Sequence, residues 1–488
     1  MVDVPVFKII DIEFFERPVR LRLPFRFGAV TLTEATEAFV RARIRLADGR
    51  DIVGATAELM VPKWFDKDPR RSNAENVDQL RFSLALARDA YTADAIPRGA
   101  FSHSAVHHAA CTAEGERQGL PALAAAFGPA EVDRAILDAL CNGLQISFEH
   151  AIRNNVVGFE PWLLAPDLAG LDVHALLSTL APRSTIALRH TVGLADVVSG
   201  HPSHAADGLP ESLEEVIAAY CPAWFKIKLG GDIAADVSRL IEISALLDRL
   251  PQYHVTLDGN EQFASVEPVG ELVARVRAEP RLERLVAAIM YLEQPLPRHR
   301  ALVDDVAFIA AQIPLLIDES DATYDAFPRA RALGYTGVSS KSCKGLYKSL
   351  ANLARCRRWN AKASALRYFL SAEDLTAQAG LAVQQDLALA ALLGIEHSER
   401  NGHHYANGMA AAPREEQQAF LDAHPDLYER SRGAVRLAIR DGTIALGSLS
   451  HPGFASGASP DWDTLSTQPA APLQRPRSTE AAGFTSRV

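Results

Sequence analysis

Acidic residues follow three successive apolar runs in the middle of the chain. Asp258 ends VTLD, Glu293 ends MYLE and Asp318 ends LLID. If these runs are parallel strands of one barrel, the three carboxylates meet at one rim and repel one another unless a cation is bound. All-oxygen ligation suits Mg²⁺, which also keeps positions for substrate oxygens. A helix N-cap acid after each strand is the alternative, but three in consecutive units favour a metal site.

Lysines accompany these acids. Lys226 and Lys228 lie two residues apart in FKIK, so in a strand their side chains point to the same face. Two neighbouring ammonium groups disfavour each other's protonation, which lowers a lysine pKa toward a value useful for a general base. Lys341 ends a later run, GVSSK, with Lys344 as a substitute. Because the second and sixth strands of an eight-stranded barrel lie opposite each other, Lys228 and Lys341 would flank a substrate.

The elements that must position these residues are short apolar runs separated by helix-like stretches. The runs are TIALRHTVG, WFKIKLGGD, HVTLDGNEQ, IMYLEQPL, PLLIDES, GVSSKSCKG, LRYFLSAED and ALLGIEHSE. This spacing predicts an α/β fold with a parallel (β/α)8 barrel, in which catalytic groups lie at the C-terminal ends of the strands. The last run also fits the end of the preceding helix.

Other regions flank the predicted barrel of residues 181–405. Residues 1–180 read as an N-terminal α+β domain, with an antiparallel meander over 5–60, a hairpin turn at Ala47-Asp48-Gly49, and helices after residue 75. Residues 406–447 contain a strand-like pair and are predicted to return to that domain. Residues 448–488 are rich in Ser, Pro, Ala and Gly and are predicted to be a disordered tail.

Composition excludes several classes of protein. The 488 residues carry 50 Lys+Arg and 60 Asp+Glu, a formal net charge of −10, and 48% are hydrophobic. This is the composition of a folded globular chain, and the acid excess argues against nucleic acid or a membrane surface as a partner. The five cysteines form no CxxC, and the N-terminus does not read as a signal peptide. No stretch approaches the ~20 apolar residues of a membrane span. We therefore expect a cytoplasmic protein.

The order of the motifs resembles the enolase superfamily, and most closely its muconate-lactonizing-enzyme-like subgroup, within the mandelate racemase/muconate lactonizing enzyme family. The motifs FKIKLGGD, TLDGNE, YLEQPL and LIDES carry the resemblance, which covers residues 5–445. It implies a modified TIM barrel with an N-terminal α+β capping domain, one Mg²⁺ (or Mn²⁺) per subunit on the three acids, a small-molecule carboxylate substrate and a homo-oligomer. Lys228 and Lys341 would be the acid/base pair, and Lys226 would tune Lys228 or touch the substrate carboxylate.

Cap loops that close over the barrel mouth set specificity in this family. The resemblance and the strand ends together give the candidates for substrate contact: Arg26, Phe27, Lys63 and Trp64 in the loops, His190 at the end of the first barrel run, and Glu319 and Glu373 after the fifth and seventh runs. The two loop cations would meet a second substrate anion, and the two aromatic rings would cover an apolar group.

A histidine cluster lies near the end of the predicted barrel. His397, His403 and His404 match no zinc-binding spacing, so a polar contact between cap and barrel is the default interpretation. A second metal site is the alternative.

The predicted reaction is Mg²⁺-dependent abstraction of the α-proton of a carboxylate, giving an enolate. Two opposed lysines favour racemisation or epimerisation of an amino-acid or hydroxy-acid derivative; β-elimination or cycloisomerisation, and a catalytically inactive binding protein, are the alternatives. Lys341 stands where mandelate racemases proper use a His–Asp pair. The eighth run lacks the Asp-x-Asp of dipeptide epimerases, and LRYFLSAEDL lacks the histidine that an acid-sugar dehydratase would more often show.

Overall fold

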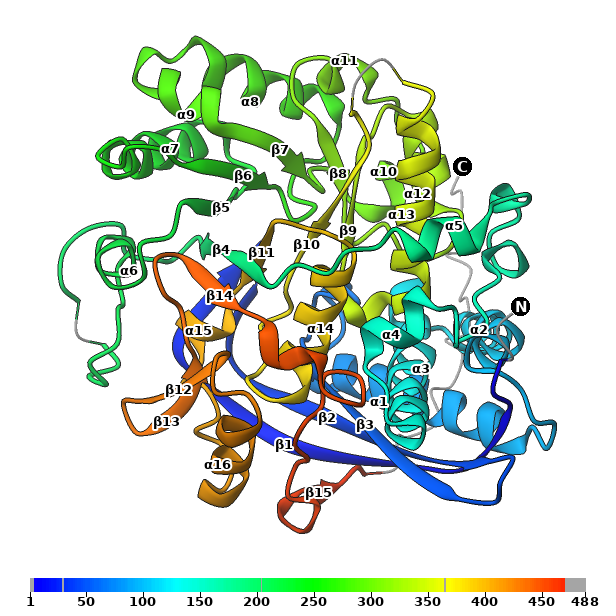
Figure 1. The fold of residues 1–488 in the computed structure, drawn as a ribbon. Helices are drawn as coiled ribbons and strands as arrows, with labels where there is room; N and C mark the ends of the chain where they lie inside the picture. The colour runs from blue at the N-terminus through cyan, green and yellow to red at the C-terminus, as the bar shows by residue number, and fades with distance from the viewer. Residues whose placement is uncertain (1–3, 29, 203, 364–365, 470–488) are drawn as a thin grey trace, which may run out of the picture.

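A four-stranded antiparallel sheet underlies the N-terminal domain in the computed structural model, which describes residues 4–28, 30–202, 204–363 and 366–469 (Figure 1). Its order is β15-β1-β2-β3, with β1 at Phe7–Phe27, β2 at Val30–Leu46 and β3 at Asp51–Met60. The predicted turn at Ala47-Asp48-Gly49 joins β2 to β3. Gly49 takes a φ of 89°, which glycine adopts without steric cost.

Three long helices follow the sheet: α1 Asn73–Ala93, α2 Ala100–Arg117 and α3 Ala122–Leu144. Helices α1 and α3 pack on the sheet, and α2 packs on these two helices. Helix α3 approaches β3 so closely that a β-carbon on Gly54 would lie 2.0 Å from the Ala139 nitrogen. One hydrophobic core runs from the sheet through α3 to the barrel helices, so the cap and the barrel are joined by packing. Short helices lead into the barrel: α4 Phe148–Arg153, η1 Pro161–Leu163, η2 Pro166–Leu168 and α5 Val173–Ser178.

Eight parallel strands form a closed barrel, because each pairs with the next and the last pairs with the first. They are β4 Thr185–Val192, β5 Trp224–Lys228, β6 His254–Asp258, β7 Ile289–Glu293, β8 Leu315–Ile317, β9 Gly337–Ser340, β10 Phe369–Ala372 and β11 His397–Arg400. Each predicted run supplies one strand, which confirms the (β/α)8 prediction. The eighth run is divided, since its first residues end helix α14.

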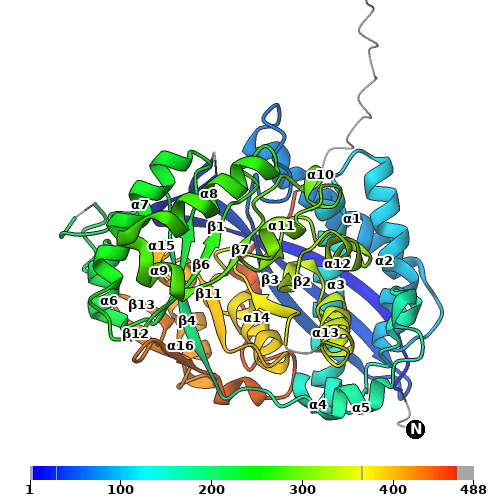
Figure 2. The same cartoon turned by 90° about the horizontal axis from the view of Figure 1, so that it is seen from above.

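Helices connect the strands and cover the barrel. They are α6 Leu213–Tyr220, α7 Ile233–Leu247, α8 Val266–Ala278, η3 Pro280–Leu282, α9 Glu283–Ala288, α10 Arg298–Ala301, α11 Ala307–Ala310, α12 Ala326–Ala332, η4 Ser342–Lys344, α13 Leu346–Asn360 and α14 Leu381–Leu392. Figure 2 shows α7, α8 and α9 on the side of the barrel away from α1 and α2.

The segment after the last barrel strand contacts both domains. It contains α15 Gly402–Tyr405, α16 Arg414–Ala423, β12 Tyr428–Ser431, β13 Ala434–Leu437 and β14 Thr443–Ala445. Arg17 of β1 donates two hydrogen bonds to Glu416 of α16, at 2.8 and 2.6 Å. Strand β14 pairs antiparallel with barrel strand β4. The segment therefore bridges the cap sheet and the barrel.

The prediction of a disordered tail from residue 448 is wrong as far as residue 469. This part contains η5 Gly447–Ser450, η6 Trp462–Thr464 and β15 Ser466–Thr467, and β15 pairs with β1. Phe454 is fully buried and stacks on Phe148 with ring centroids 4.0 Å apart. One buried aromatic ring and a strand pairing thus order a segment of disorder-prone composition. The rest of the predicted tail, 470–488, lies outside the described residues.

Two sequence expectations concern the chain as a whole. All five cysteines are free thiols in the structure. In the described ranges, no helix is both long enough and apolar enough to cross a membrane.

Candidate active site

Three carboxylates lie at adjacent C-terminal strand ends of the barrel. Asp258 ends β6 and is paired in register with Glu293, which ends β7, while Asp318 directly follows β8. Their side chains are buried, with exposed fractions of 0%, 0% and 1%. The structure thus brings together at one rim the three acids that the sequence singled out as metal ligands.

Two lysines approach these acids from different strands. Lys228 ends β5, and its Nζ lies 2.6 Å from Oδ2 of Asp258. Lys341 follows β9, and its Nζ lies 2.7 Å from Oδ2 of Asp318. Each predicted acid/base lysine is therefore paired with a different carboxylate of the rim.

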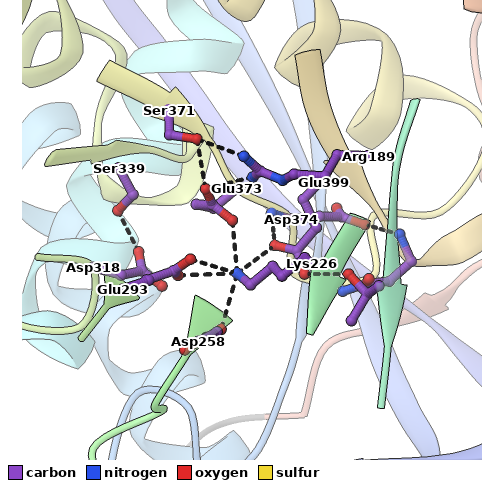
Figure 3. Close-up of polar contacts among 12 residues, drawn as sticks. Arg189, Lys226, Asp258, Glu293, Asp318, Ser339, Ser371, Glu373, Asp374 and Glu399 are labelled. Atoms are coloured by element: carbon purple, nitrogen blue, oxygen red, sulfur yellow. Dashed lines mark hydrogen bonds and ion pairs between the residues drawn. The ribbon is translucent and has the colours of Figure 1, made fainter. Parts of the chain in front are cut away.

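Lys226 lies at the centre of the charged cluster (Figure 3). Its Nζ contacts Asp258 at 3.0 Å, Glu293 at 2.8 Å, Glu373 at 2.7 Å and Glu399 at 3.0 Å. Burial alone would lower the pKa of Lys226, but the negative charges of these carboxylates raise it well above its usual value. The four carboxylates thus outweigh burial and hold Lys226 as a cation.

The Lys341 ammonium is also stabilised as a cation. Burial and the charge of Lys226 lower its pKa, whereas Asp318 raises it, and the net shift is upward. The negative charges of Asp318, Glu399 and Glu293 together therefore outweigh the opposing effects of burial and of Lys226.

An arginine and a glutamate that sequence reasoning left out complete the cluster. Arg189 of β4 pairs with Glu373 after β10, and it donates a 2.8 Å hydrogen bond to Ser371. Glu399 of β11 accepts hydrogen bonds from Lys226 and from Thr191, the latter at 2.8 Å. Strand alternation was the available signal, since Arg189 and Thr191 are two residues apart and share a face.

Asp318 is held by groups on β9 and the turn after it. Ser339 donates a hydrogen bond to its Oδ1, and the Nζ of Lys344 lies 3.4 Å from the same atom. Lys344 also lies 3.2 Å from Asp321. Lys341 contacts the other oxygen of Asp318, so each oxygen of this carboxylate faces a different lysine of the turn.

Cap residues close the mouth of the barrel over the lysines. The small cavity is lined by Phe25, Phe27, Val61, Trp64, Lys228, Asp258, Asn260, Asp318, Lys341, Asp374, Leu375, Thr376 and Asn401. The Lys341 Nζ lies 4.2 Å from the centre of the Trp64 ring, and the Lys228 Nζ lies 6.0 Å from that of Phe25. Each lysine thus has one aromatic ring of the cap near it.

Five predicted substrate contacts are not among the residues that line this cavity: Arg26, Lys63, His190, Glu319 and Glu373. Arg26 is exposed, because Phe25 and Phe27 on either side of it face inward. The Lys63 ammonium donates to the backbone carbonyls of Asp68 and Arg71 within its own loop. Neither of the two cations expected to bind a second substrate anion therefore lines the cavity.

His190 is the third correction, and it concerns the face of a strand. Its neighbours Arg189 and Thr191 point into the barrel, so alternation turns His190 outward. Its Nδ1 lies 3.2 Å from Nε2 of His403, and its ring centroid lies 5.0 Å from that of His404.

The predicted histidine cluster is divided between two places. His403 and His404 pack against His190 outside the barrel, and Arg22 of β1 donates a 2.8 Å hydrogen bond to the His404 carbonyl. His397 stacks on Trp224, with ring centroids 4.1 Å apart. The contact from β1 agrees with the default interpretation of a polar junction between cap and barrel.

Glu319 lies beside the rim and ties a cap loop to it. Its Oε1 lies 3.2 Å from the Nζ of Lys67 and 3.3 Å from Nδ2 of Asn260. Lys67 also pairs with Glu261 at 2.8 Å. Arg298 pairs with the same Glu261 and donates a hydrogen bond of 2.8 Å to the Trp64 carbonyl. These contacts fix the loop that carries Trp64.

The donor set at the rim fits a divalent cation. Besides the three carboxylates, Oδ1 of Asn260 and Oε2 of Glu319 are buried oxygens that accept no hydrogen bond within the described ranges. Burial, with the charges of Asp258 and Glu373, raises the pKa of Glu293 well above its usual value. Anionic oxygens are therefore crowded here, in an all-oxygen arrangement of the kind that binds Mg²⁺.

Comparison with known proteins identifies the fold. No family model matches the sequence, and no curated protein matches it. Solved structures match over most of the chain. A dipeptide epimerase from Enterococcus faecalis V583, complexed with Mg and the dipeptide L-Leu-L-Tyr, is 13% identical, with a TM-score of 0.57 over 92% of this chain and 99% of its own.

Two further structures give the same result. A member of the enolase superfamily from Roseovarius nubinhibens ISM, complexed with magnesium, is 17% identical, with a TM-score of 0.56 over 94% of this chain and 97% of its own. A 2-chloromuconate cycloisomerase from Rhodococcus opacus 1CP is 15% identical, with a TM-score of 0.58 over 93% and 98%. At such low identity the similarity shows a shared fold: a modified TIM barrel with a capping domain, as in enolase-superfamily enzymes.

Proposed function

We propose that this protein is an enzyme of the enolase superfamily that abstracts the α-proton of a carboxylate substrate, and that it is a racemase or epimerase. The observation that carries the proposal is the pairing of Lys228 with Asp258 and of Lys341 with Asp318 at one cavity. Lys228 ends the second barrel strand, Lys341 follows the sixth, and each pairs with a different carboxylate. A substrate held between them has a proton acceptor on one side and a donor on the other.

The metal in this proposal is Mg²⁺, one per subunit, with Mn²⁺ as a substitute. Asp258, Glu293 and Asp318 would hold it. When bound, it would stabilise the negative charge that develops on the substrate carboxylate as the α-proton leaves.

The chain's own residues then have separate tasks. Lys228 and Lys341 hold or accept a proton at Nζ. Lys226 is fixed by four carboxylates, so we assign it to charge balance inside the barrel. The aromatic cap residues and the nearly complete burial of both reacting lysines, 6% and 3% exposed, exclude water from the proton transfers.

We propose a monocarboxylate substrate with an apolar group next to the reacting carbon. The cap contributes Phe25, Phe27, Val61 and Trp64 to the cavity, and neither Lys63 nor Arg26 brings a cation to it. This lining suits N-acylamino acids, dipeptides with apolar side chains and aryl hydroxy acids. The dipeptide in the epimerase from E. faecalis has that character.

Cycloisomerisation or β-elimination is the second candidate, because the fold is shared with a 2-chloromuconate cycloisomerase and the same lysine pair permits it with one lysine only holding charge. A dicarboxylate substrate would need a second cation, which the cap lining does not supply. A binding protein without turnover is the third candidate, and the complete set of acids and lysines argues against it.

The proposal is tested by exchange of the α-proton in D₂O. The protein with Mg²⁺ is incubated with a panel of N-acylamino acids, dipeptides and hydroxy acids of each configuration. We expect deuterium at the α-carbon, with inversion, for substrates that carry apolar side chains. Formation of an unsaturated or cyclised product would instead support the lyase or cycloisomerase alternative. No exchange with any substrate, together with no Mg²⁺ binding, would support the binding protein.

A further inference from the structure

Three side chains with metal-ligand chemistry gather on the cap, where the connection between α1 and α2 meets the start of β1. They are Asp94, His103 and His107. The two histidines are four residues apart on α2, which places them on one face of the helix. One ligand atom from each of the three residues lies within 4.8 Å of the others. The contact between His107 Nε2 and Asp94 Oδ2 is 3.1 Å.

The cluster has a buried nitrogen with no partner. His103 is fully buried, and its Nε2 lies 3.2 Å from the Phe7 carbonyl oxygen. Its Nδ1 has no hydrogen-bond partner in the part of the chain that the structure describes. Leaving a buried polar atom unpaired is costly, and structures usually satisfy it. The side chains of Asp94 and His107 are 10% and 11% exposed, so the cluster reaches solvent on one side.

The donor types suit a divalent metal of the zinc class. Two imidazoles and one carboxylate are ligands that zinc takes in proteins.

We propose that Asp94, His103 and His107 form a second metal site, selective for a Zn²⁺-class ion. Ligand atoms in a tetrahedral zinc site are roughly 3.4 Å apart, given bonds of about 2.0–2.1 Å. Atoms already within 4.8 Å therefore need only side-chain adjustments. Nitrogen ligands separate this site from the all-oxygen rim of the barrel, which suits Mg²⁺.

The position of the site suggests its effect. Phe7 and Arg98 exchange two backbone hydrogen bonds of 3.0 Å each, so the first residue of β1 is already paired with the connection between α1 and α2. A metal on this cluster would join α2 to that connection next to the pair, and would stabilise the cap rather than take part in the reaction.

Arg98 is the competitor for this site. Its Nε donates to Oδ2 of Asp94 at 2.8 Å, the same oxygen that His107 contacts. Its side chain is 23% exposed and can move toward solvent. Because Arg98 competes with the metal for this oxygen, removal of the Arg98 side chain should tighten metal binding.

The test uses Co²⁺ as a spectroscopic probe and Zn²⁺ for calorimetry, with the full-length Asp258→Asn protein so that the barrel rim does not bind the probe. We expect one equivalent of Zn²⁺ and the visible absorption of tetrahedral Co²⁺. Both signals should be lost in His107→Ala and in Asp94→Asn. Arg98→Ala should bind more tightly, and His108→Ala, one residue along the same helix, should bind as before.

The melting temperature gives a second measure of metal binding. Zn²⁺ should raise the melting temperature of the parent protein but not that of His107→Ala, whose folding is checked by circular dichroism; His107→Gln replaces it if the alanine variant does not fold. Absence of Zn²⁺ binding would overturn the proposal. Binding that persists in both His107→Ala and Asp94→Asn would also overturn it, because a surface thiol such as Cys221 would give that result. Proton exchange in the protein with an intact rim does not depend on this outcome.

Discussion

The Nζ of Lys341 lies 2.7 Å from Oδ2 of Asp318, and neither side chain is more than 4% exposed. The Lys228–Asp258 pair repeats this arrangement on the second barrel strand. Two lysines with separate carboxylates can hold different protonation states during one reaction, whereas two lysines that share one carboxylate would be tightly coupled. The pairing therefore supports a reaction with one proton transfer on each side of the substrate.

The first prediction concerns the two lysines. Lys228→Ala and Lys341→Ala should each slow α-proton exchange with one configuration of the substrate by about 10²- to 10⁴-fold, because each removes one general base. Exchange with the opposite configuration should persist at a measurable rate. Deuterium incorporation from D₂O, followed by NMR, reports both. Lys362→Ala, at an exposed lysine, is the control. Normal exchange in both alanine variants would rule out the two-base mechanism.

The second prediction concerns the metal. Asp258→Asn and Glu293→Gln should lose Mg²⁺ binding in isothermal titration calorimetry, since each replaces an anionic ligand of the proposed site with a neutral amide. Asp248→Asn, at a carboxylate that accepts from Tyr253 outside the barrel rim, should bind Mg²⁺ like the parent. Unchanged Mg²⁺ affinity in both rim variants would show that the carboxylates serve only to pair with the lysines.

Much of the barrel could be predicted from sequence because its signals are local. A short apolar run that ends in an acid or lysine marks both a strand and the end at which its functional group lies, as at Asp258 and Lys228. The prediction that the His190 side chain faces the site was wrong for a related reason: neighbouring residues of a strand point to opposite faces, so an error of one residue reverses the predicted direction. Arg189, next to it, therefore escaped notice although it lies inside the barrel.

The cap could not be predicted to the same depth, because its loops take their conformations from distant contacts. Lys63 has a φ of 65°, and its ammonium is held by two backbone carbonyls, which no local pattern indicates. Trp64 is placed by Arg298, more than two hundred residues further along the chain. Substrate contacts on such loops follow from tertiary structure rather than from spacing.

The third prediction concerns this loop. Arg298→Ala should raise KM by roughly tenfold, since charge-assisted hydrogen bonds of about 1.5–3 kcal/mol hold the Trp64 and Phe65 carbonyls at 2.8 and 2.7 Å. The value of kcat should change less, because Arg298 does not line the cavity. Arg300→Ala is the matched control, because Arg300 pairs with Asp304 on the surface. Equal KM values for the two variants would contradict a role in holding the loop.

The fourth prediction concerns a buried acid of the cap. Asp133 accepts hydrogen bonds from Ser104 at 2.6 Å and Tyr91 at 2.8 Å, and burial raises its pKa from 3.8 to about 7. The folded state therefore keeps this proton to a higher pH than the unfolded state does. The resulting stability is complete below about pH 4 and is lost as the pH rises to about 7, by at most about 4 kcal/mol at 1.36 kcal/mol per unit.

Asp133→Asn tests this assignment, because the amide does not titrate. The difference in unfolding free energy between parent and variant, measured by urea denaturation across this pH range, should shift in favour of the variant as the pH rises. Asp89→Asn, on the exposed side of α1, should follow the pH dependence of the parent. Other buried acids contribute equally to both curves and cancel in the difference. Parallel curves for the parent and Asp133→Asn would mean that Asp133 is ionised in the folded cap throughout, with the two hydroxyl donors compensating for burial.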